Sequence, residues 1–290
     1  MINKTKIIAT IGPSTSSKEM ISKITQRGVS VCRINFSHVS HSEAKEIIDN
    51  IKEVNKQINT HTAILADLQG PKIRVGNFEK PIKLKKGSYI YFNTTQKQPN
   101  DIFISYSNFA KDVKKGDRVL LDDGKLSLLV ENSNGKNRVK LKVVFGGLLK
   151  SNKGVNLPNT DISLHCLTKK DKLDLNFLLE QKIEWIGLSF VRSAEDVKKL
   201  KTIIKRHKKS QALVIAKIEK PEAVNDIDNI ILETDAIMVA RGDLGVEVPL
   251  HKVPVFQKMI VQKCIKQSKP VVIATQMLES MTDNISATRA

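Results

Sequence analysis

The chain has 290 residues and a formal net charge of +18, with 48 lysines and arginines against 30 aspartates and glutamates. Its 40% of hydrophobic residues is ordinary for a globular protein with a substantial core and excludes a peptide or a disordered tail. The three cysteines are far apart and show no CxxC or CxxH spacing, which favours a reduced, cytoplasmic chain. The first apolar run ends at Gly12 and Pro13, too early for a signal sequence or a membrane span.

The high positive charge is also a property of nucleic-acid-binding proteins, whose cations neutralise phosphates. Here lysine outnumbers arginine 39 to 9, whereas proteins that read nucleic-acid sequence rely on arginine and on aromatic stacking. The densest basic stretch, residues 198–209, has apolar residues at helical spacing, so it predicts an amphipathic helix with a solvated basic face. We expect no nucleic-acid partner, and a nucleic-acid-binding protein is the weakest alternative.

Residues 1–70 alternate between short apolar runs and helical patterns. The runs KIIATIG, SVCRINFS and TAILADLQG predict strands. Between them, Ser16 with Glu19 and Ser40 with Glu43 predict capping boxes at two helix starts. Alternation at this spacing implies parallel strands joined by right-handed crossovers, so we assign residues 1–70 to the first part of a barrel.

The pattern changes between residues 71 and 157. Helical periodicity disappears, and short alternating segments are separated by Gly, Asn and Asp. DDGK at 122–125 and NSNG at 132–135 are hairpin signals. This segment is predicted to be an inserted antiparallel β-barrel domain.

Residues 158–290 return to the strand and helix alternation. Thr168 with Asp171 and Ser193 with Asp196 predict capping boxes on either side of the strand IEWIGLSFV. The strands LVIAKIE, AIMVARGD and PVVIATQ follow, which gives seven from the N-terminus. The predicted fold is α/β: a TIM-type parallel barrel that lacks its last strand, with the β domain inserted as a lid.

Polar residues stand near the carboxyl ends of these strands. They are Arg33, Asp67, Lys217, Glu219, Asp243 and Thr275. Residues i and i+2 of a strand share a face, and inward residues at strand ends converge on one mouth of a parallel barrel. Two carboxylates with room for substrate oxygens suit magnesium, and nearby cations can neutralise a phosphoryl group in transfer. The alternative is a set of ordinary ion pairs at strand ends.

Eight stretches carry a resemblance to a known family. They are KIIATIGPS, CRINFSH, DLQGPKIR, KGVNLP, LSFVRS, IAKIE, ARGDLGVE and ATQMLESM, in this order along the whole chain. In sequence and order they closely resemble pyruvate kinase. The resemblance implies a barrel interrupted after its third strand by a mobile lid, and transfer of a phosphoryl group from phosphoenolpyruvate to ADP in glycolysis. It also implies a cytoplasmic enzyme without membrane contact, in a family of homo-oligomers.

Carried over residue by residue, the resemblance assigns magnesium or manganese to Glu219 and Asp243. It makes Lys217 the stabiliser of the phosphoryl group in transfer. Phosphoenolpyruvate would be bound by Arg33, Lys217, the backbone amides of Gly242 and Asp243, and Thr275, which also lies on the route of enolate protonation. The implied nucleotide contacts are Asn35, Phe36, Ser37, His38, Arg74 and Lys153.

The resemblance also bears on a monovalent cation. Members that need potassium bind it through residues that match Asn35, Ser37 and Asp67. They typically carry Thr and Glu where this chain has Leu68 and Lys72. We therefore expect that potassium is not required, because the Lys72 ammonium supplies the positive charge. The alternative is a neutral surface substitution at position 72.

In the family, an eighth strand and a C-terminal domain with subunit contacts follow the position of Ala290. The chain thus carries every predicted catalytic residue, while the strand that closes the barrel lies beyond it. Two expectations follow. The chain is a pyruvate kinase, active as given or within a longer or assembled polypeptide, or it is a catalytically inactive remnant of one.

Overall fold

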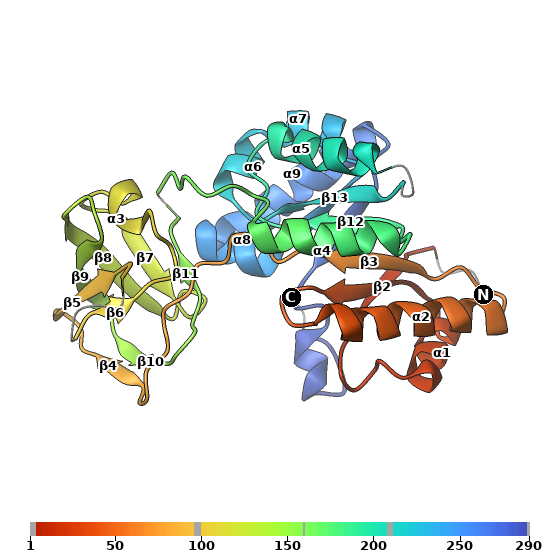
Figure 1. The fold of residues 1–290 in the computed structure, drawn as a ribbon, viewed down its shortest axis with the longest axis horizontal. Helices are drawn as coiled ribbons and strands as arrows, with labels where there is room; N and C mark the ends of the chain where they lie inside the picture. The colour runs from red at the N-terminus through yellow and green to blue at the C-terminus, as the bar shows by residue number, and fades with distance from the viewer. Residues whose placement is uncertain (1–3, 96–99, 159, 208–210, 289–290) are drawn as a thin grey trace.

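A computed structural model of the chain describes residues 4–95, 100–158, 160–207 and 211–288. It consists of a curled parallel sheet wrapped by helices and a smaller β domain set to one side (Figure 1). This arrangement confirms the predicted α/β fold with an inserted β domain. Lys208 and Lys209, the end of the predicted basic helix, lie outside the described residues.

The larger sheet has seven strands, all parallel. In spatial order they are β1 (Ile7–Ile11), β2 (Val29–Asn35), β3 (Ala63–Asp67), β12 (Trp185–Leu188), β13 (Leu213–Ile218), β14 (Ala236–Ala240) and β15 (Val271–Ala274). Within the described residues β1 and β15 each pair on one side only, so the sheet is an incomplete barrel. The predicted count of seven strands is confirmed.

Helices surround this sheet, and most of them cover its outside (Figure 1). They are α1 (Lys18–Gln26), α2 (His41–Gln57), α4 (Lys169–Glu180), α5 (Ala194–Arg206), α6 (Pro221–Asn225), α7 (Ile227–Glu233), α8 (Arg241–Glu247) and α9 (Val253–Lys266), with short 3₁₀ turns at Leu250–Lys252 and Glu279–Thr282. None of the helices in the described ranges is long and apolar enough to cross a membrane.

Two of the four predicted capping boxes are confirmed, those of Ser40 with Glu43 and Thr168 with Asp171. The other two are wrong. The first helix is capped by Ser17, whose hydroxyl accepts a hydrogen bond from the Met20 amide, because the chain enters the helix one residue later than predicted. Ser193 makes no side-chain cap, since the Asp196 carboxylate turns to the Arg192 amide instead.

The inserted domain holds the remaining strands. They are β4 (Ile82–Leu84), β5 (Tyr89–Asn93), β6 (Ile102–Phe103), β7 (Arg118–Leu121), β8 (Leu126–Ser133), β9 (Arg138–Phe145), β10 (Gly147–Leu149) and β11 (Val155–Asn156), with the single helical turn α3 (Phe109–Asp112). β7, β8 and β9 form the two predicted hairpins. The sheet is mixed and not wholly antiparallel, because β6 pairs in parallel with β5. The domain boundaries at 70/71 and 157/158 stay a prediction.

Each part has its own core. Helices and sheet of the larger part enclose one apolar cluster, and the inserted domain encloses another. A small third cluster fills the inside of the curled sheet, built from Leu65, Ile215, Ala236 and Met238. The inside of the sheet is therefore packed, and its strands can present polar side chains only at their ends.

Candidate active site

Charged side chains meet at the carboxyl ends of β2, β3 and β13. Asp67 lies at the centre: its Oδ2 accepts from Arg33 Nε at 2.8 Å and from Nη2 at 2.5 Å. The Lys217 ammonium lies 3.0 Å from Asp67 Oδ1 and 2.9 Å from Glu219 Oε1. The prediction that these four residues converge is confirmed, and the i, i+2 spacing puts Lys217 beside Glu219.

Three of the four residues are almost completely buried, with Asp67 2%, Glu219 1% and Lys217 8% exposed, while the Arg33 side chain is 26% exposed. Burial raises the pKa of Asp67, but the charges of Lys217 and Arg33 outweigh it, so the net pKa lies below the usual value. Burial lowers the pKa of Lys217, and here Glu219 and Asp67 outweigh it, so the net pKa is raised. Lys217 is therefore a fixed cation at neutral pH.

Glu219 behaves differently from Asp67. Burial raises its pKa, and the nearby Asp243 adds to this, while Lys217 opposes both. Asp243 comes from α8, directly after β14, and lines the same pocket as Arg33, Lys217 and Glu219. Glu219 is thus a buried carboxylate with an exposed second carboxylate, Asp243, near enough to raise its pKa, and a cation near both would be favourable.

Two residues that the sequence did not single out hold this cluster in place. Ser189 Oγ accepts from Lys217 Nζ at 2.7 Å and donates to the Leu68 carbonyl at 2.7 Å. The Phe190 amide donates to Glu219 Oε2 at 2.7 Å. Phe190 has φ 55°, a conformation that non-glycine residues rarely adopt. Both lie within the stretch LSFVRS, although no spacing rule pointed to their role.

Gly70 makes room for this arrangement. It has φ 67°, and a Cβ atom at this position would lie 2.6 Å from Cδ2 of the Phe190 ring. Glycine is therefore required here by both conformation and space. The missing side chain leaves space for the Phe190 ring, and the backbone amide of Phe190 donates to Glu219.

Thr275 lies next to Gly242 but outside the buried pocket. Its Oγ1 accepts from the Gly242 amide at 2.8 Å and donates to the Ala274 carbonyl at 2.6 Å. Thr275 has φ 68° and is exposed. The structure thus brings five of the six predicted strand-end residues into one pocket. The sixth, Thr275, lies outside it and is bonded to Gly242, the residue before Asp243.

The predicted nucleotide residues fall into four places, three of them in the barrel domain. Asn35 and Ser37 line the buried pocket, where the Asn35 side chain accepts from the Ser37 amide. His38 lines a separate hollow beside the end of β1, which Asn35 also reaches. Phe36 has a fully buried side chain; its amide donates to the Asp67 carbonyl and its carbonyl accepts from Lys170.

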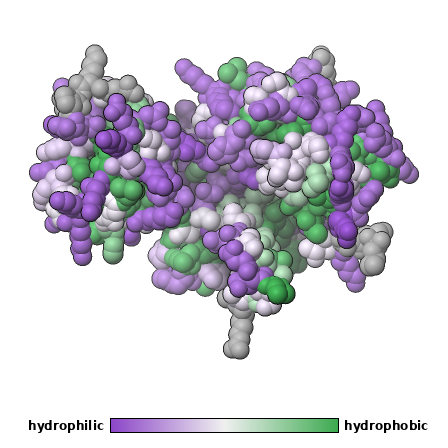
Figure 2. Space-filling model, turned by 90° about the horizontal axis from the view of Figure 1, so that it is seen from below, coloured by the Kyte–Doolittle hydropathy of each residue, from purple (hydrophilic) through white to green (hydrophobic). Residues whose placement is uncertain are grey.

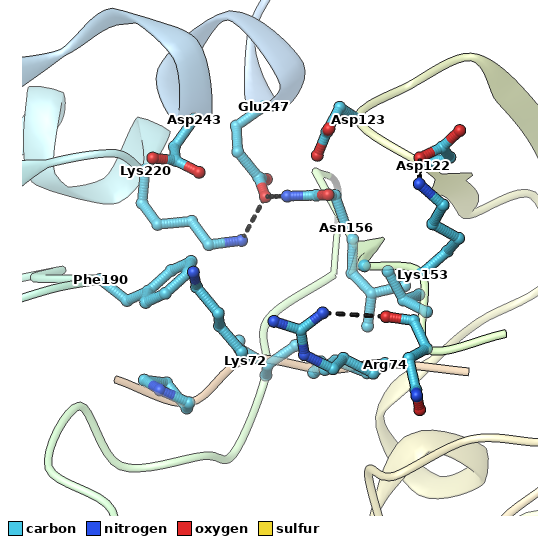
Figure 3. Close-up of a pocket in the computed structure, with 17 residues that line it drawn as sticks. Lys72, Arg74, Asp122, Asp123, Lys153, Asn156, Phe190, Lys220, Asp243 and Glu247 are labelled. Atoms are coloured by element: carbon cyan, nitrogen blue, oxygen red, sulfur yellow. Dashed lines mark hydrogen bonds and ion pairs between the residues drawn. The ribbon is translucent and has the colours of Figure 1, made fainter. Parts of the chain in front are cut away.

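Arg74 and Lys153 lie in the cleft between the inserted domain and the barrel domain (Figure 3). Both are engaged within the inserted domain: Arg74 Nη1 donates to the Asn152 carbonyl at 2.8 Å, and Lys153 lies 2.7 Å from Asp122. Lys72 lines both this cleft and the buried pocket. Hydrophilic side chains dominate both sides of the junction (Figure 2).

A direct hydrogen bond joins the two parts across this cleft. The Asn156 side-chain amide, from β11, donates to Glu247 Oε1 at 2.8 Å, and the Lys220 ammonium lies 2.8 Å from the same oxygen (Figure 3). Lys220 and Glu247 are buried, at 6% exposure each. Sequence reasoning missed these three residues because Asn156 and Glu247 are 91 positions apart.

The site fits a magnesium ion that shares its coordination with a substrate. The described residues hold no group of three or more His, Cys, Asp or Glu side chains that could bind a metal by themselves. Magnesium, however, commonly takes only one or two carboxylates and completes its shell with water and phosphate oxygens. Glu219 and Asp243 provide that pair, and burial together with the charge of Asp243 raises the pKa of Glu219, which a bound cation would offset.

Comparisons with known proteins agree with this geometry. Residues 2–290 match the family described as "Pyruvate kinase, barrel domain". The pyruvate kinase of Staphylococcus aureus (strain MRSA252) is 42% identical over 293 residues, covering 100% of this chain and 50% of that protein. Pyruvate kinase 2 of Synechocystis is 43% identical, covering 99% of this chain and 49% of its own length.

A solved structure is also similar. The crystal structure of a pyruvate kinase from Cryptosporidium parvum superimposes with a TM-score of 0.92 at 38% identity, covering 99% of this chain and 60% of that one. The chain spans about half the length of the curated relatives it matches. The family match runs through both the barrel strands and the inserted domain. This chain belongs to the pyruvate kinase barrel-domain family.

Proposed function

We propose that this chain catalyses, in the cytoplasm, the transfer of the phosphoryl group of phosphoenolpyruvate to ADP, giving pyruvate and ATP. The observation that carries the proposal is the buried Lys217 ammonium held between Asp67 and Glu219. A lysine kept charged inside a protein, beside an arginine and two metal-type carboxylates, is suited to stabilise a phosphoryl group in transfer. An ordinary ion pair on the protein surface would be exposed to solvent, whereas this one is buried.

Arg33 and Lys217 are proposed to hold the phosphoryl oxygens. Both cations already have fixed positions, because Asp67 binds one on each of its oxygens. A cation that is held in place before the substrate arrives need not be reoriented as charge develops in the transition state. Asp67 is therefore proposed as a positioning residue for both.

Glu219 and Asp243 would hold the magnesium or manganese ion, which when bound supplies positive charge next to the substrate oxygens. The pocket contains three carboxylates, of Asp67, Glu219 and Asp243, and three cations, of Arg33, Lys72 and Lys217. It is thus neutral by formal charge on the protein alone. A divalent cation would make it positive, as a site for an anionic substrate requires.

The carboxylate of phosphoenolpyruvate is proposed to bind at the amides of Gly242 and Asp243 and at the Thr275 hydroxyl. The Gly242 amide is now satisfied by Thr275 Oγ1, so substrate would replace an existing hydrogen bond. The same hydroxyl, which lies on the exposed side, is proposed to deliver a proton to the enolate. ADP would lie along Asn35, Ser37 and His38, with Phe36 anchoring this segment through its buried ring.

The nucleotide phosphates are proposed to reach Arg74 and Lys153 in the cleft. Their present partners, a backbone carbonyl and the partly exposed Asp122, are replaceable. Lys72 lies between this cleft and the buried pocket, where Asn35, Ser37 and Asp67 would otherwise offer oxygens to a monovalent cation. We therefore propose that potassium is not required, and strong activation of the enzyme by potassium would refute this part.

A coupled assay of the purified 290-residue chain with phosphoenolpyruvate, ADP and magnesium tests the proposal. Activity should be lost in Lys217→Met and retained in Lys205→Met, which changes an exposed lysine of α5. Equal activity of the two variants would sink the assigned mechanism. A folded chain that binds phosphoenolpyruvate but never turns over favours the inactive remnant. Repeating the assay with and without potassium tests the role of Lys72.

A further inference from the structure

A second basic hollow lies on the outer layer of the barrel domain, between α5, the first turn of α4 and the loop before α4. It has a volume of about 400 Å³. It shares no lining residue with the buried pocket or with the cleft between the inserted domain and the barrel domain. Four cations line it: Lys172, Lys198, Lys199 and Arg206. The proposed phosphoryl transfer uses none of them.

These four cations have no side-chain partner in the described residues. Within the described residues, none of the four forms an ion pair or a side-chain hydrogen bond, whereas Lys201 on the same helix lies 2.8 Å from Asp235. Two carboxylates also line the hollow, but Asp196 is nearly buried and accepts from the Arg192 amide. The hollow therefore has an excess of positive charge, which an anion would relieve.

The positions of the cations follow from the helix. α5 buries Val197, Leu200 and Ile204 against the sheet, so Lys198 and Arg206 extend from another side. Their spacing is two steps of four residues, which places them along one side of the helix with Thr202 between them. Lys198 and Arg206 thus lie in a row along one wall, and Lys172 of α4 belongs to the same lining.

The shape and chemistry of the hollow select the ligand class. Its volume lies within the range of pockets that enclose small molecules, about 300–1,000 Å³. Half-buried Leu167 and Ile203 form an apolar part of its wall, and His165 is the one aromatic ring among its lining residues, which include no Phe, Tyr or Trp. We propose that this hollow is a binding site for a small phosphorylated metabolite.

The floor of the hollow is connected to the catalytic lysine. Cys166 lines the hollow, is buried, and donates from its thiol to the Ser189 carbonyl at 3.1 Å. The Ser189 hydroxyl in turn accepts from Lys217 Nζ. A ligand that shifts the loop around Cys166 would therefore act on the residue that holds Lys217. This regulatory consequence rests on the proposed function, whereas the binding site itself does not.

Binding can be tested without any assay of activity. The native thiols of Cys32, Cys166 and Cys264 are buried, and burial raises their pKa, that of Cys32 and Cys264 to about 11. Thr202→Cys therefore adds the one thiol that iodoacetamide should modify readily. Inorganic pyrophosphate, at ionic strength matched with chloride, should slow this alkylation about tenfold when present at about ten times its dissociation constant.

A charge-matched pair of variants shows whether the protection comes from the hollow. In the Thr202→Cys background, Lys198→Ala with Arg206→Ala should abolish the protection. Arg27→Ala with Lys111→Ala removes two exposed cations elsewhere and should leave it unchanged. Comparing rates with and without pyrophosphate within each variant cancels any change in the basal reactivity of the thiol. Absence of protection, or equal protection in both double variants, would overturn the proposal.

Two further arms separate a small ligand from a polyanion. An RNA duplex or phosphatidylserine vesicles that protect the thiol better than pyrophosphate, at equal phosphate concentration, would also overturn it. Pyrophosphate can also be added to the coupled assay. An effect on activity is assigned to the hollow if Lys198→Ala with Arg206→Ala removes it and the control pair keeps it. Protection in a chain without phosphoryl transfer would refute the proposed function alone, and activity without protection would refute this inference alone.

Discussion

The buried pocket of the barrel domain and the cleft under the lid hold similar numbers of charges but hold them in different ways. In the pocket, Lys217, Asp67 and Glu219 are at most 8% exposed, and each charge touches an opposite one. In the cleft, the Lys153 side chain is 35% exposed and its partner Asp122 is 17% exposed. Buried pairs are costly to break, whereas exposed pairs exchange partners easily. The pocket is therefore built in advance. The cleft shares this property only at the buried pair of Lys220 and Glu247, whereas Lys153 and Asp122 on its other side can exchange partners.

The largest effect is expected from Asp67→Asn, which leaves Arg33 and Lys217 without the carboxylate that binds both. Losing one partner of a buried ion pair costs about 3–5 kcal/mol of the free energy of unfolding. Urea denaturation at neutral pH measures this. Asp49→Asn is the control, because its pair with Lys45 on α2 is exposed and should contribute less than about 1 kcal/mol.

The same pair of variants gives a pH dependence with a defined sign. The pKa of Asp67 is lower in the folded protein, so its contribution to stability is present above the unfolded pKa of about 3.9. It is lost as the pH falls through the folded pKa. The difference in unfolding free energy between wild type and Asp67→Asn should therefore be constant from pH 7 to 5 and shrink below pH 4. A difference that grows in acid would contradict the assigned ion pairs.

The residues of the buried pocket were largely predictable because regular strands fix where side chains point. Lys217 and Glu219 are two positions apart on one strand, so they had to share a face. Asp67 follows from the same logic at the end of a neighbouring strand. Ser189 and Phe190 were not predictable, because they lie just after β12, where a left-handed residue breaks the alternation.

The cleft was much less predictable, since its contacts join residues that no local pattern relates. The bond from Asn156 to Glu247 depends on how the inserted domain sits against α8, which periodicity does not determine. The parallel pairing of β6 with β5 was missed for a similar reason. Alternation predicts a strand, but not the direction in which a two-residue edge strand pairs.

A smaller effect is expected from Gly70→Ala, which tests how far the pocket depends on the turn at Phe190. The added Cβ would meet the Phe190 ring at 2.6 Å, on top of the cost of a positive φ. We expect a loss of about 2–4 kcal/mol and a lower kcat, because Phe190 must move away from Glu219. Gly116→Ala is the matched control: it has φ 94° and no atom within 4 Å of the added Cβ. Equal losses in the two variants would show that conformation alone matters.

The smallest effect on stability, but a diagnostic one, is expected in the cleft. Lys153 is paired with Asp122, whose pKa is lowered mainly by the hydrogen bond from that lysine. We expect that Lys153 must leave this carboxylate to reach a nucleotide phosphate. Asp122→Asn removes the competing carboxylate and should lower KM for ADP about threefold. Lys153→Ala removes the phosphate contact and should raise KM for ADP about tenfold. Both variants should change the unfolding free energy by less than about 1 kcal/mol, because the pair is partly exposed.

Lys125→Ala separates this competition from a general change of charge in the lid. Lys125 also lies near Asp122, at 3.5 Å, but its side chain is 71% exposed and it does not line the cleft. KM for ADP should therefore stay within about twofold of wild type in this variant, since its charge is screened by solvent. A rise in KM on Asp122→Asn would mean that the carboxylate positions Lys153 for the nucleotide. The cleft would then be as preorganised as the buried pocket, and the difference between the two regions would be one of exposure only.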